Sequence, residues 1–275
     1  YLPLVGGRQV FAHNISRQLS LMGHDVDVYI PIKSYNNLQP RFRELCVPLP
    51  RFYYGLIAKL PSIGLIRAQR HLKMLQQKEN YDAWLVVASY PSGYAASCLK
   101  KIVPIVLRAS GDDIQKSQDL EYGLRLNHSY ETAIQHTVQS FDKVVAMTQE
   151  ARREFLTLGV TNDAIVNIPN GIDLEWFDQK QSIYEIRTKL GWPIDEQIIL
   201  TTGRNHPKKG FNLIPSIADK LRDKGFRFKW FVVGMGTDQL LQEIKNRQLD
   251  EYVLTENEIG VSVNTQNEWR FPHQK

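Results

Sequence analysis

The chain has 275 residues, of which 43% are hydrophobic and 23% are charged, so it is long enough for two globular domains, each with its own core. No apolar run reaches the roughly 18 residues of a spanning helix, and no charged leader precedes an apolar segment, which predicts neither a transmembrane helix nor a signal peptide. A formal charge of +5 favours anionic partners such as phosphates or an acidic membrane surface, while no recognised motif points to nucleic acid.

The chain has two cysteines, Cys46 and Cys98, which lie far apart and follow no metal-ligand spacing. Two cysteines are too few for the disulfide framework of a small secreted domain. We therefore expect reduced thiols and a cytoplasmic location.

Strand and helix patterns alternate along the chain, which predicts βαβ units with parallel sheets. In the first part, helical periodicity covers residues 9–22 and 62–78, separated by a less regular stretch at 31–61. Strand patterns cover residues 25–30, 84–88, 103–107, 143–147 and 164–168. Thr148 is expected to cap a helix, and the turn signal Pro169-Asn170-Gly171 ends this part.

The alternation then starts again, with a helix at 182–190, a strand at 198–202, a helix at 211–224 and a strand at 228–233. We predict two α/β halves, residues 1–172 and 173–275. The second holds only about three strands, fewer than a doubly wound domain usually has. Because the chain enters a glycine turn without a preceding strand and ends without a completed unit, we expect a fragment of a longer protein.

A basic turn follows the strand at 198–202. Gly203 and Gly210 relax the backbone at its ends, and Arg204 and Lys209 lie between them. Open α/β sheets bind ligands at the carboxyl ends of their strands, near helix N-termini. The turn therefore predicts a diphosphate pocket, and a solvated basic loop is the alternative that these residues alone leave open.

Three other segments carry candidate chemistry. Gly6-Gly7 would let a ligand approach backbone N–H groups at a helix N-terminus, or it is an ordinary helix entry. The run from Arg108 to Asp113 places a cation and two carboxylates after a buried strand, although Asp112 or Asp113 would equally cap a following helix. Gly234-Met235-Gly236 would admit a nucleotide but falls short of a dinucleotide fingerprint.

In this order and approximate spacing, the motifs resemble GT-B glycosyltransferases of family 4, also called glycosyl transferase group 1. The resemblance extends across nearly the whole chain. It rests on Gly6-Gly7, Leu21 to Val26, Phe141 to Ala146, Ile168 to Asp173, Gly203-Arg204 with Lys208 to Gly210, and Val232 to Gly236.

The resemblance implies an α/β GT-B fold of two Rossmann-like, doubly wound domains with parallel sheets facing across a cleft, the second incomplete. Residues 1–172 would form the acceptor-side domain and residues 173–275 part of the nucleotide-sugar-binding domain. The implied reaction moves a sugar from a nucleotide diphosphate sugar, the co-substrate, to a hydroxyl of a saccharide or lipid-linked acceptor, with retention of configuration. Neither a metal nor another cofactor is implied, and the setting would be cell-envelope glycan, glycolipid or polysaccharide synthesis.

By the same resemblance, Arg204 and Lys209 contact the donor diphosphate, and we assign catalytic roles to these two residues and Asp112. The donor is also expected at Gly6, Gly7, Gly203, Gly210, Gly234 and Gly236. The acceptor side comprises Arg108, Ser110, Gly111 and Asp112, and the hinge comprises Asn170 and Gly171.

Two departures from the family pattern matter. Ser110 stands where many relatives carry a histidine, which weakens the prediction of a catalytic imidazole. Two glutamates that hold the donor sugar and ribose in the family would fall beyond Lys275, so we expect incomplete donor binding or an inactive fragment. His206 is expected to be simply exposed rather than a substitute base.

Cations and aromatics mix at residues 41–43, 51–59 and 67–73, which favours peripheral contact with the anionic cytoplasmic face of a membrane. A solvated helix face is the alternative, because Leu65, Ile66, Leu72 and Leu75 also suit ordinary helix packing. For the whole chain, a sugar-nucleotide epimerase of the same fold and a non-catalytic nucleotide-sugar-binding module remain alternatives. The second draws support from Ser110 and the missing glutamates.

Overall fold

The computed structural model describes residues 6–31, 45–49, 61–172, 174, 182–257, 262–263 and 269–270. The helices are α1 (Gly7–Leu21), α3 (Pro61–Glu79), α4 (Tyr94–Ala96), α5 (His128–Val138), α6 (Gln149–Thr157), α7 (Ile183–Leu190), α8 (Ile214–Asp223) and α9 (Leu241–Asn246). The strands are β1 (Asp27–Pro31), β2 (Leu45–Leu49), β3 (Trp84–Val87), β4 (Ile105–Arg108), β5 (Lys143–Ala146), β6 (Ile165–Asn167), β7 (Gln197–Thr202), β8 (Phe228–Val233), β9 (Val253–Glu256), β10 (Ser262–Val263) and β11 (Trp269–Arg270).

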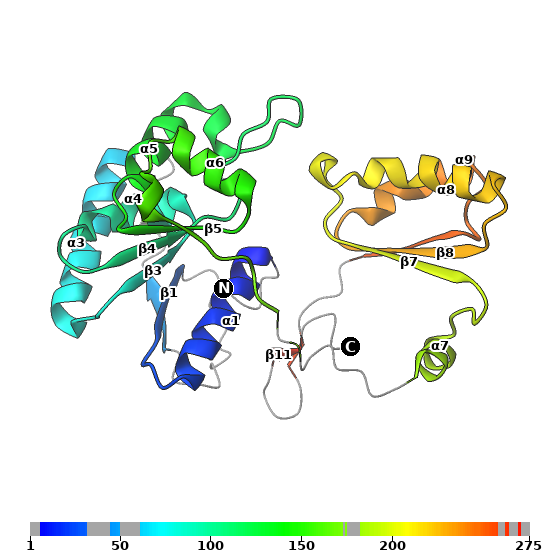
Figure 1. Cartoon of the computed structure of the whole chain (residues 1–275), viewed down its shortest axis with the longest axis horizontal. Helices are drawn as coiled ribbons and strands as arrows, with labels where there is room; N and C mark the ends of the chain where they lie inside the picture. The colour runs from blue at the N-terminus through cyan, green and yellow to red at the C-terminus, as the bar shows by residue number, and fades with distance from the viewer. Residues whose placement is uncertain are drawn as a thin grey trace. The chain divides into compact units, whose positions relative to one another are not determined.

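The chain divides into two compact units (Figure 1). Unit 1 comprises Tyr1–Gly171 with Val263–Trp269, and unit 2 comprises Ile172–Ser262 with Arg270–Lys275. A short sheet pairs β10 with β11.

Unit 1 contains a parallel sheet in the order β3-β4-β5-β6 and a second parallel pair, β1-β2. Helix α1 lies on one face of the larger sheet and α5 on the other (Figure 1). The alternation of side chains along β4 explains this layering. Leu107 is fully buried on the α5 side, whereas Arg108 points to the other face and meets Phe11 of α1.

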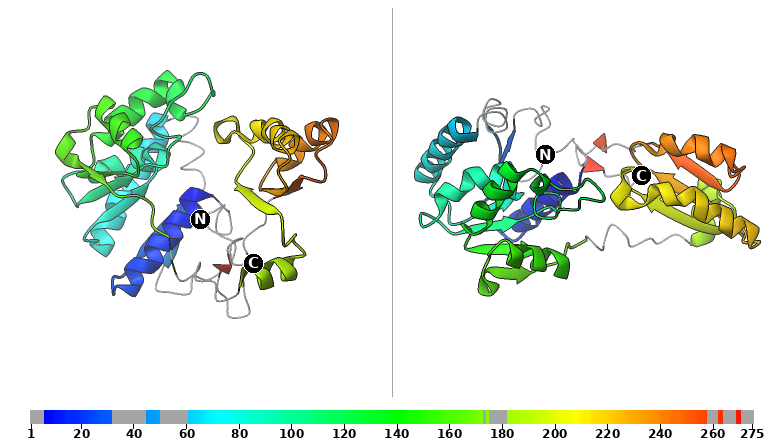
Figure 2. Two further views of the ribbon diagram at one scale, coloured as in Figure 1. Left: turned by 45° about the vertical axis from the view of Figure 1, so that its right-hand side comes forward. Right: turned by 90° about the horizontal axis from the view of Figure 1, so that it is seen from above.

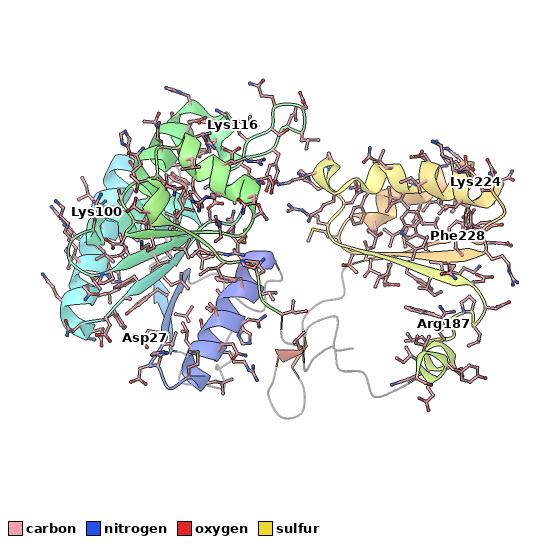
Figure 3. All side chains as sticks on the ribbon, in the orientation of Figure 1. Asp27, Lys100, Lys116, Arg187, Lys224 and Phe228 are labelled. Atoms are coloured by element: carbon pink, nitrogen blue, oxygen red, sulfur yellow. The ribbon has the colours of Figure 1, made fainter. Side chains whose placement is uncertain are left out.

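Unit 2 contains the parallel sheet β7-β8-β9. Helices α8 and α9 lie side by side over one face of it, as the view from above shows (Figure 2). Strand β8 alternates between buried and partly buried residues, beginning with Phe228, which is labelled in Figure 3. Its buried face packs against Ile214 and Ala218 of α8 and Ile244 of α9. Burying a large apolar side chain such as Phe228, Ile214 or Ile244 contributes roughly 1.5–3 kcal/mol.

The predicted α/β class with parallel sheets is confirmed, and Thr148 does cap α6, because its hydroxyl accepts a hydrogen bond from the Ala151 N–H at 3.1 Å. Several details of the sequence interpretation were wrong. The stretch at 31–61 contains β2, and α5, α9 and β9 had not been predicted. The helix expected from residue 211 begins as a 3-10 turn, Phe211–Leu213, before α8. The basic segments 41–43 and 51–59 lie outside the described residues.

Candidate functional site

The candidate residues of unit 2 gather at the carboxyl ends of β7 and β8. Gly203 and Gly234 end these strands with φ of +147° and +143°, backbone conformations that other residues rarely adopt. The Gly203 N–H donates to the Val233 carbonyl at 2.9 Å. A Cβ on Gly234 would lie 1.8 Å from the Gly203 carbonyl oxygen, which is an impossible overlap. The two loops therefore touch backbone to backbone, and Gly234 has no substitute.

Asn205 ties these loops together, a role that the sequence interpretation missed. Its backbone N–H donates to the Met235 carbonyl at 2.9 Å, and its side-chain amide donates to the Gly236 carbonyl at 3.0 Å. Asparagine side chains commonly form hydrogen bonds with nearby backbone groups in tight turns, and this tendency was the one feature of the sequence that could have indicated the role of Asn205. Gly236 itself has a φ of +77°. The predicted donor-binding glycines of both loops thus form one bonded surface.

Arg204 and Lys209 project from this surface into solvent. Neither side chain forms a hydrogen bond or ion pair with another residue in the part of the chain that the structure describes. The segment that carries Lys209 is a 3-10 turn, Pro207–Lys209, closed by Gly210 at a φ of +68°. Both cations are therefore available to an anion, and their roles stay predictions.

His206 is not simply exposed, which corrects the sequence interpretation. It is partly buried, and its Nδ1 accepts a hydrogen bond from the Lys208 N–H at 3.2 Å, so the imidazole caps the 3-10 turn. Phe211 is 1% exposed and its ring lies 3.6 Å from where a Cβ of Gly203 would be. The basic turn consequently has a fixed shape, with one face on the core of unit 2.

In unit 1, the first turn of α1 is open. Gly6 stands at its N-cap, no side-chain cap bond is made there, and the first turn contains no acidic residue. A Cβ on Gly7 would meet nothing within 4 Å in the described part of the chain. The free N–H groups of this turn carry the positive end of the helix dipole. Among the described residues the space beside Gly7 is open, whereas the Gln9 side chain lies over Gly6.

Arg8 joins this turn to the loop that follows β4. Its guanidinium donates to the Asp112 carboxylate, and the two side chains are 36% and 41% exposed. The sequence interpretation named Asp112 but not Arg8, although an arginine directly after Gly6-Gly7 was a visible signal. The pair brings two predicted parts of the site together, α1 and the β4 loop.

Arg108 is only 4% exposed and connects three segments of unit 1. Its Nη2 donates to the Asn170 side-chain oxygen at 2.9 Å, its Nη1 lies 3.5 Å from the Ser110 hydroxyl, and its guanidinium stacks 4.0 Å from the centre of the Phe11 ring. Burial lowers the pKa of Arg108, nearby Asp113 opposes that shift, and Arg8 adds to it. Arg108 thus anchors Asn170, the predicted hinge residue, while its contact with an acceptor stays a prediction.

Asp113 is not a helix cap. It is fully buried, and its two carboxylate oxygens accept hydrogen bonds from the backbone N–H groups of Ser89 and Ser110. The capping alternative was therefore wrong for Asp113, because its carboxylate accepts hydrogen bonds from backbone N–H groups of two loops at the carboxyl edge of the sheet.

Arg125 anchors the far end of the loop that runs from β4 to α5. It is 5% exposed, donates to the Ile114 carbonyl, and pairs with Glu131 at 2.8 Å and Glu154 at 2.6 Å. Lys116, labelled in Figure 3, also pairs with Glu131 at 2.7 Å. Although burial opposes it, the hydrogen bonds from Lys116 and Arg125 lower the pKa of Glu131. Nothing in the sequence indicated this network.

The remaining predictions concern metals, thiols and membranes. Among the described residues, no three His, Cys, Asp or Glu side chains gather as a metal-binding group, and no helix there is long and apolar enough to span a bilayer. The Cys98 thiol donates to the Gln69 carbonyl at 3.6 Å, and burial raises its pKa. In α3, Leu72 is buried and Leu75 packs against the core, but Ile66 is 50% exposed.

Sequence comparison identifies relatives along most of the chain. Residues 5–176 match the family described as Glycosyltransferase Family 4. The putative teichuronic acid biosynthesis glycosyltransferase TuaC of Bacillus subtilis is 25% identical over 284 residues, covering 90% of this chain and 69% of that protein. A D-inositol 3-phosphate glycosyltransferase of Xylanimonas cellulosilytica is 26% identical over 242 residues, covering 80% of this chain and 56% of that protein. The same enzyme of Kineococcus radiotolerans is 34% identical over 95 residues, covering 34% of this chain and 22% of that protein.

Solved structures show the same fold. A sucrose-phosphate synthase of Thermosynechococcus elongatus superposes with a TM-score of 0.68 at 14% identity, covering 93% of this chain and 66% of that one. WaaG, a glycosyltransferase involved in lipopolysaccharide biosynthesis, gives 0.65 at 18% identity, with coverage of 93% and 68%. HepE of Anabaena in complex with UDP-glucose gives 0.66 at 16% identity, with coverage of 94% and 67%. The predicted GT-B fold is thereby confirmed, and this chain spans about two thirds of these structures.

Proposed function

The chain belongs to glycosyltransferase family 4, and we propose that it moves a sugar from a nucleoside diphosphate sugar to a hydroxyl acceptor with retention of configuration. The observation that carries this proposal lies in unit 2. Two glycine loops meet backbone to backbone, and beside them project Arg204 and Lys209, two cations that have no partner among the described residues. Such a surface suits a diphosphate, because glycines admit it closely and cations balance its charge.

The leaving group sets the main electrostatic demand of the reaction. As the bond between the anomeric carbon and the diphosphate oxygen breaks, negative charge builds on the diphosphate. Arg204 and Lys209 would stabilise that charge, and Gly203, Gly210, Gly234 and Gly236 would let the nucleotide lie against the backbone. The protein's own cations would meet this demand, so we expect turnover to persist in EDTA.

The nucleotide base of the donor can be identified by titration with different nucleoside diphosphate sugars. HepE has been solved with UDP-glucose, UDP, and UDP with glucose, which supports a uridine donor as the first candidate. Titration with uridine, guanosine and adenosine diphosphate sugars would rank the three bases. Consumption of a donor without any acceptor, and with epimerised sugar as product, would support the epimerase alternative instead.

The acceptor is assigned to the edge of unit 1 formed by α1 and the β4 loop. There, Asp112 would accept a hydrogen bond from the acceptor hydroxyl while Arg8 orients its carboxylate, and Ser110 and Gly111 would line the same corner. The open first turn at Gly6-Gly7 would contact the transferred sugar or its phosphates. The names of TuaC and WaaG support a saccharide or lipid-linked acceptor of the cell envelope.

The hinge is assigned to Asn170 and Gly171. Arg108 holds the Asn170 side chain within unit 1, whereas a Cβ on Gly171 would meet nothing within 4 Å among the described residues. We therefore expect rotation between the units to begin at Gly171, on donor binding.

Peripheral membrane binding is assigned to the exposed face of α3. Arg70 and Lys73 are exposed there beside Ile66 and Met74, which are 50% and 54% exposed. Cations beside apolar side chains suit an anionic lipid surface, and this role would place the protein on the cytoplasmic face of the membrane. Phosphatidylglycerol vesicles should retain the protein, and salt should release it. The double substitution Arg70→Gln with Lys73→Gln should weaken its binding to these vesicles. Equal retention on phosphatidylcholine vesicles would remove this assignment.

The catalytic proposal is tested by removing the two cations one at a time. Arg204→Ala and Lys209→Ala should each lower kcat/KM for UDP release from UDP-glucose on the order of 100-fold, because each removes stabilisation of the developing charge. Lys224→Ala is the matched control, since Lys224 is an exposed cation of unit 2 at the other end of α8 (Figure 3). Near-normal turnover in both site variants would show that the donor binds elsewhere.

A further inference from the structure

The carboxylate of Asp113 joins two loops at the carboxyl edge of the unit 1 sheet. One oxygen accepts the Ser89 backbone N–H at 2.6 Å, and the other accepts the Ser110 backbone N–H at 2.7 Å. The Ser89 hydroxyl donates back to the Asp113 carbonyl at 2.9 Å. Both Asp113 and Ser89 are completely buried. We call these three bonds the Asp113 link.

The Asp113 carboxylate lies near the Arg108 guanidinium, but both of its hydrogen bonds go to backbone N–H groups, so the Asp113 link fixes backbone geometry. Removing a carboxylate from water costs several kcal/mol, and no described arginine or lysine donates a hydrogen bond to this one. Its two short, charge-assisted bonds offset that cost. An apolar replacement would leave the buried Ser89 N–H without an acceptor, at about 1–3 kcal/mol, and would also release the partly buried Ser110 N–H. The role of the carboxylate is therefore to fix the positions of the two loops relative to each other.

The loop that carries Ser89, which the Asp113 link joins to the Ser110 loop, is strained at Ala88. Ala88 has a φ of +80° and a ψ of 136°, a region that costs a residue with a side chain on the order of 1–3 kcal/mol. Its N–H donates to the Arg108 carbonyl at 3.0 Å, and its carbonyl accepts from the Gly93 N–H at 3.1 Å. Such strain persists only where surrounding contacts impose the path of the chain. Here they are the two backbone bonds of Ala88 itself and the Asp113 link at the next residue, Ser89.

We propose that Asp113 is a positioning residue for the acceptor. By holding Ser110, it fixes the corner from Ser110 to Asp112 where Asp112 meets Arg8, and it thereby sets the place of the acceptor hydroxyl. This inference rests on the proposed function. It predicts a specific signature, because loss of the link should impair acceptor use while leaving the donor surface of unit 2 intact.

The test compares two carboxylates at opposite ends of one strand. Asp113→Asn keeps the shape of the side chain but turns an NH₂ group toward one of the backbone N–H groups. Asp142→Asn is the matched control, because Asp142 accepts the Ile105 N–H at 2.8 Å at the amino end of β4. Each variant is assayed with UDP-glucose for transfer to octyl β-glucoside, for hydrolysis of UDP-glucose, and for UDP binding.

Asp113→Asn should raise the KM for octyl β-glucoside on the order of tenfold and lower the ratio of transfer to hydrolysis similarly. UDP affinity should stay within about twofold, and Asp142→Asn should leave the ratio within about twofold. An unchanged ratio in folded Asp113→Asn, or an equal fall in Asp142→Asn, would overturn the proposal. If Asp113→Asn fails to fold, Ser89→Ala removes only the hydroxyl bond of the link and should shift the ratio in the same direction.

The outcome also separates this inference from the proposed function. Wild-type protein that neither hydrolyses nor transfers from any uridine, guanosine or adenosine diphosphate sugar would contradict the function. The Asp113 link would still be tested by hydrogen exchange, because Asp113→Asn must speed exchange at whichever of the Ser89 and Ser110 amides faces the new NH₂ group. Unchanged exchange at both amides would overturn it.

Discussion

Replacing Gly7 with alanine should separate the stability of α1 from its use in binding. Gly7 is the first residue of the helix, and a Cβ there would meet nothing within 4 Å among the described residues. Alanine loses less conformational freedom than glycine when it becomes helical, so the substitution should raise the stability of α1 by about 0.5 kcal/mol. The same methyl group would stand in the open space through which a ligand reaches the first-turn N–H groups. We therefore expect kcat/KM for UDP release to fall on the order of tenfold.

The matched control lies at the other end of the same helix. Gly23 has a φ of +92°, and a Cβ there would also meet nothing within 4 Å of the described residues. Gly23→Ala should destabilise α1 by about 1–2 kcal/mol through backbone strain while leaving kcat/KM unchanged. Hydrogen exchange of α1 peptides, compared at equal pH, measures stability within unit 1, and UDP release measures turnover. Wild-type turnover in Gly7→Ala would refute the assignment, and joint loss of turnover and protection would refute the reasoning about stability.

Two further predictions concern other parts of the chain. Gly234→Ala places its Cβ 1.8 Å from the Gly203 carbonyl oxygen, so it should destabilise unit 2 by about 3 kcal/mol or more and abolish UDP binding. If a titration showed that UDP affinity is retained, the donor site proposed at these two glycine loops would be wrong. His13 is 5% exposed, and burial together with Arg17 lowers its pKa from 6.5 to about 4. The unfolded chain therefore binds this proton more readily, so stability should be complete above pH 6.5 and should fall by up to about 3 kcal/mol as the pH drops toward 4. Urea unfolding of His13→Gln should lose that part of the pH dependence, and an unchanged dependence would show that His13 is not its source.

Much of the fold followed from local patterns. Strand β8 and the cap at Thr148 were predictable because side-chain alternation and capping are properties of a few consecutive residues. Helix α5 was overlooked although Asn127, which caps it, was a usable signal. Strand β9 was missed because Val253-Leu254-Thr255-Glu256 contains only two apolar residues, whereas β3, β4 and β5, which are equally short, each contain at least three.

The candidate site shows where local patterns stop. The sequence by itself determined that glycines and cations follow successive strands, and parallel topology then implied one shared edge for them in each unit. Only the tertiary structure decided that Arg8 meets Asp112, that Gly234 presses on Gly203, and that Asp113 joins two loops instead of capping a helix. Each of these contacts joins segments that are distant along the chain or depends on the direction of a buried side chain. Their pairing is therefore fixed by packing around the two cores, which no short window of a single sequence records.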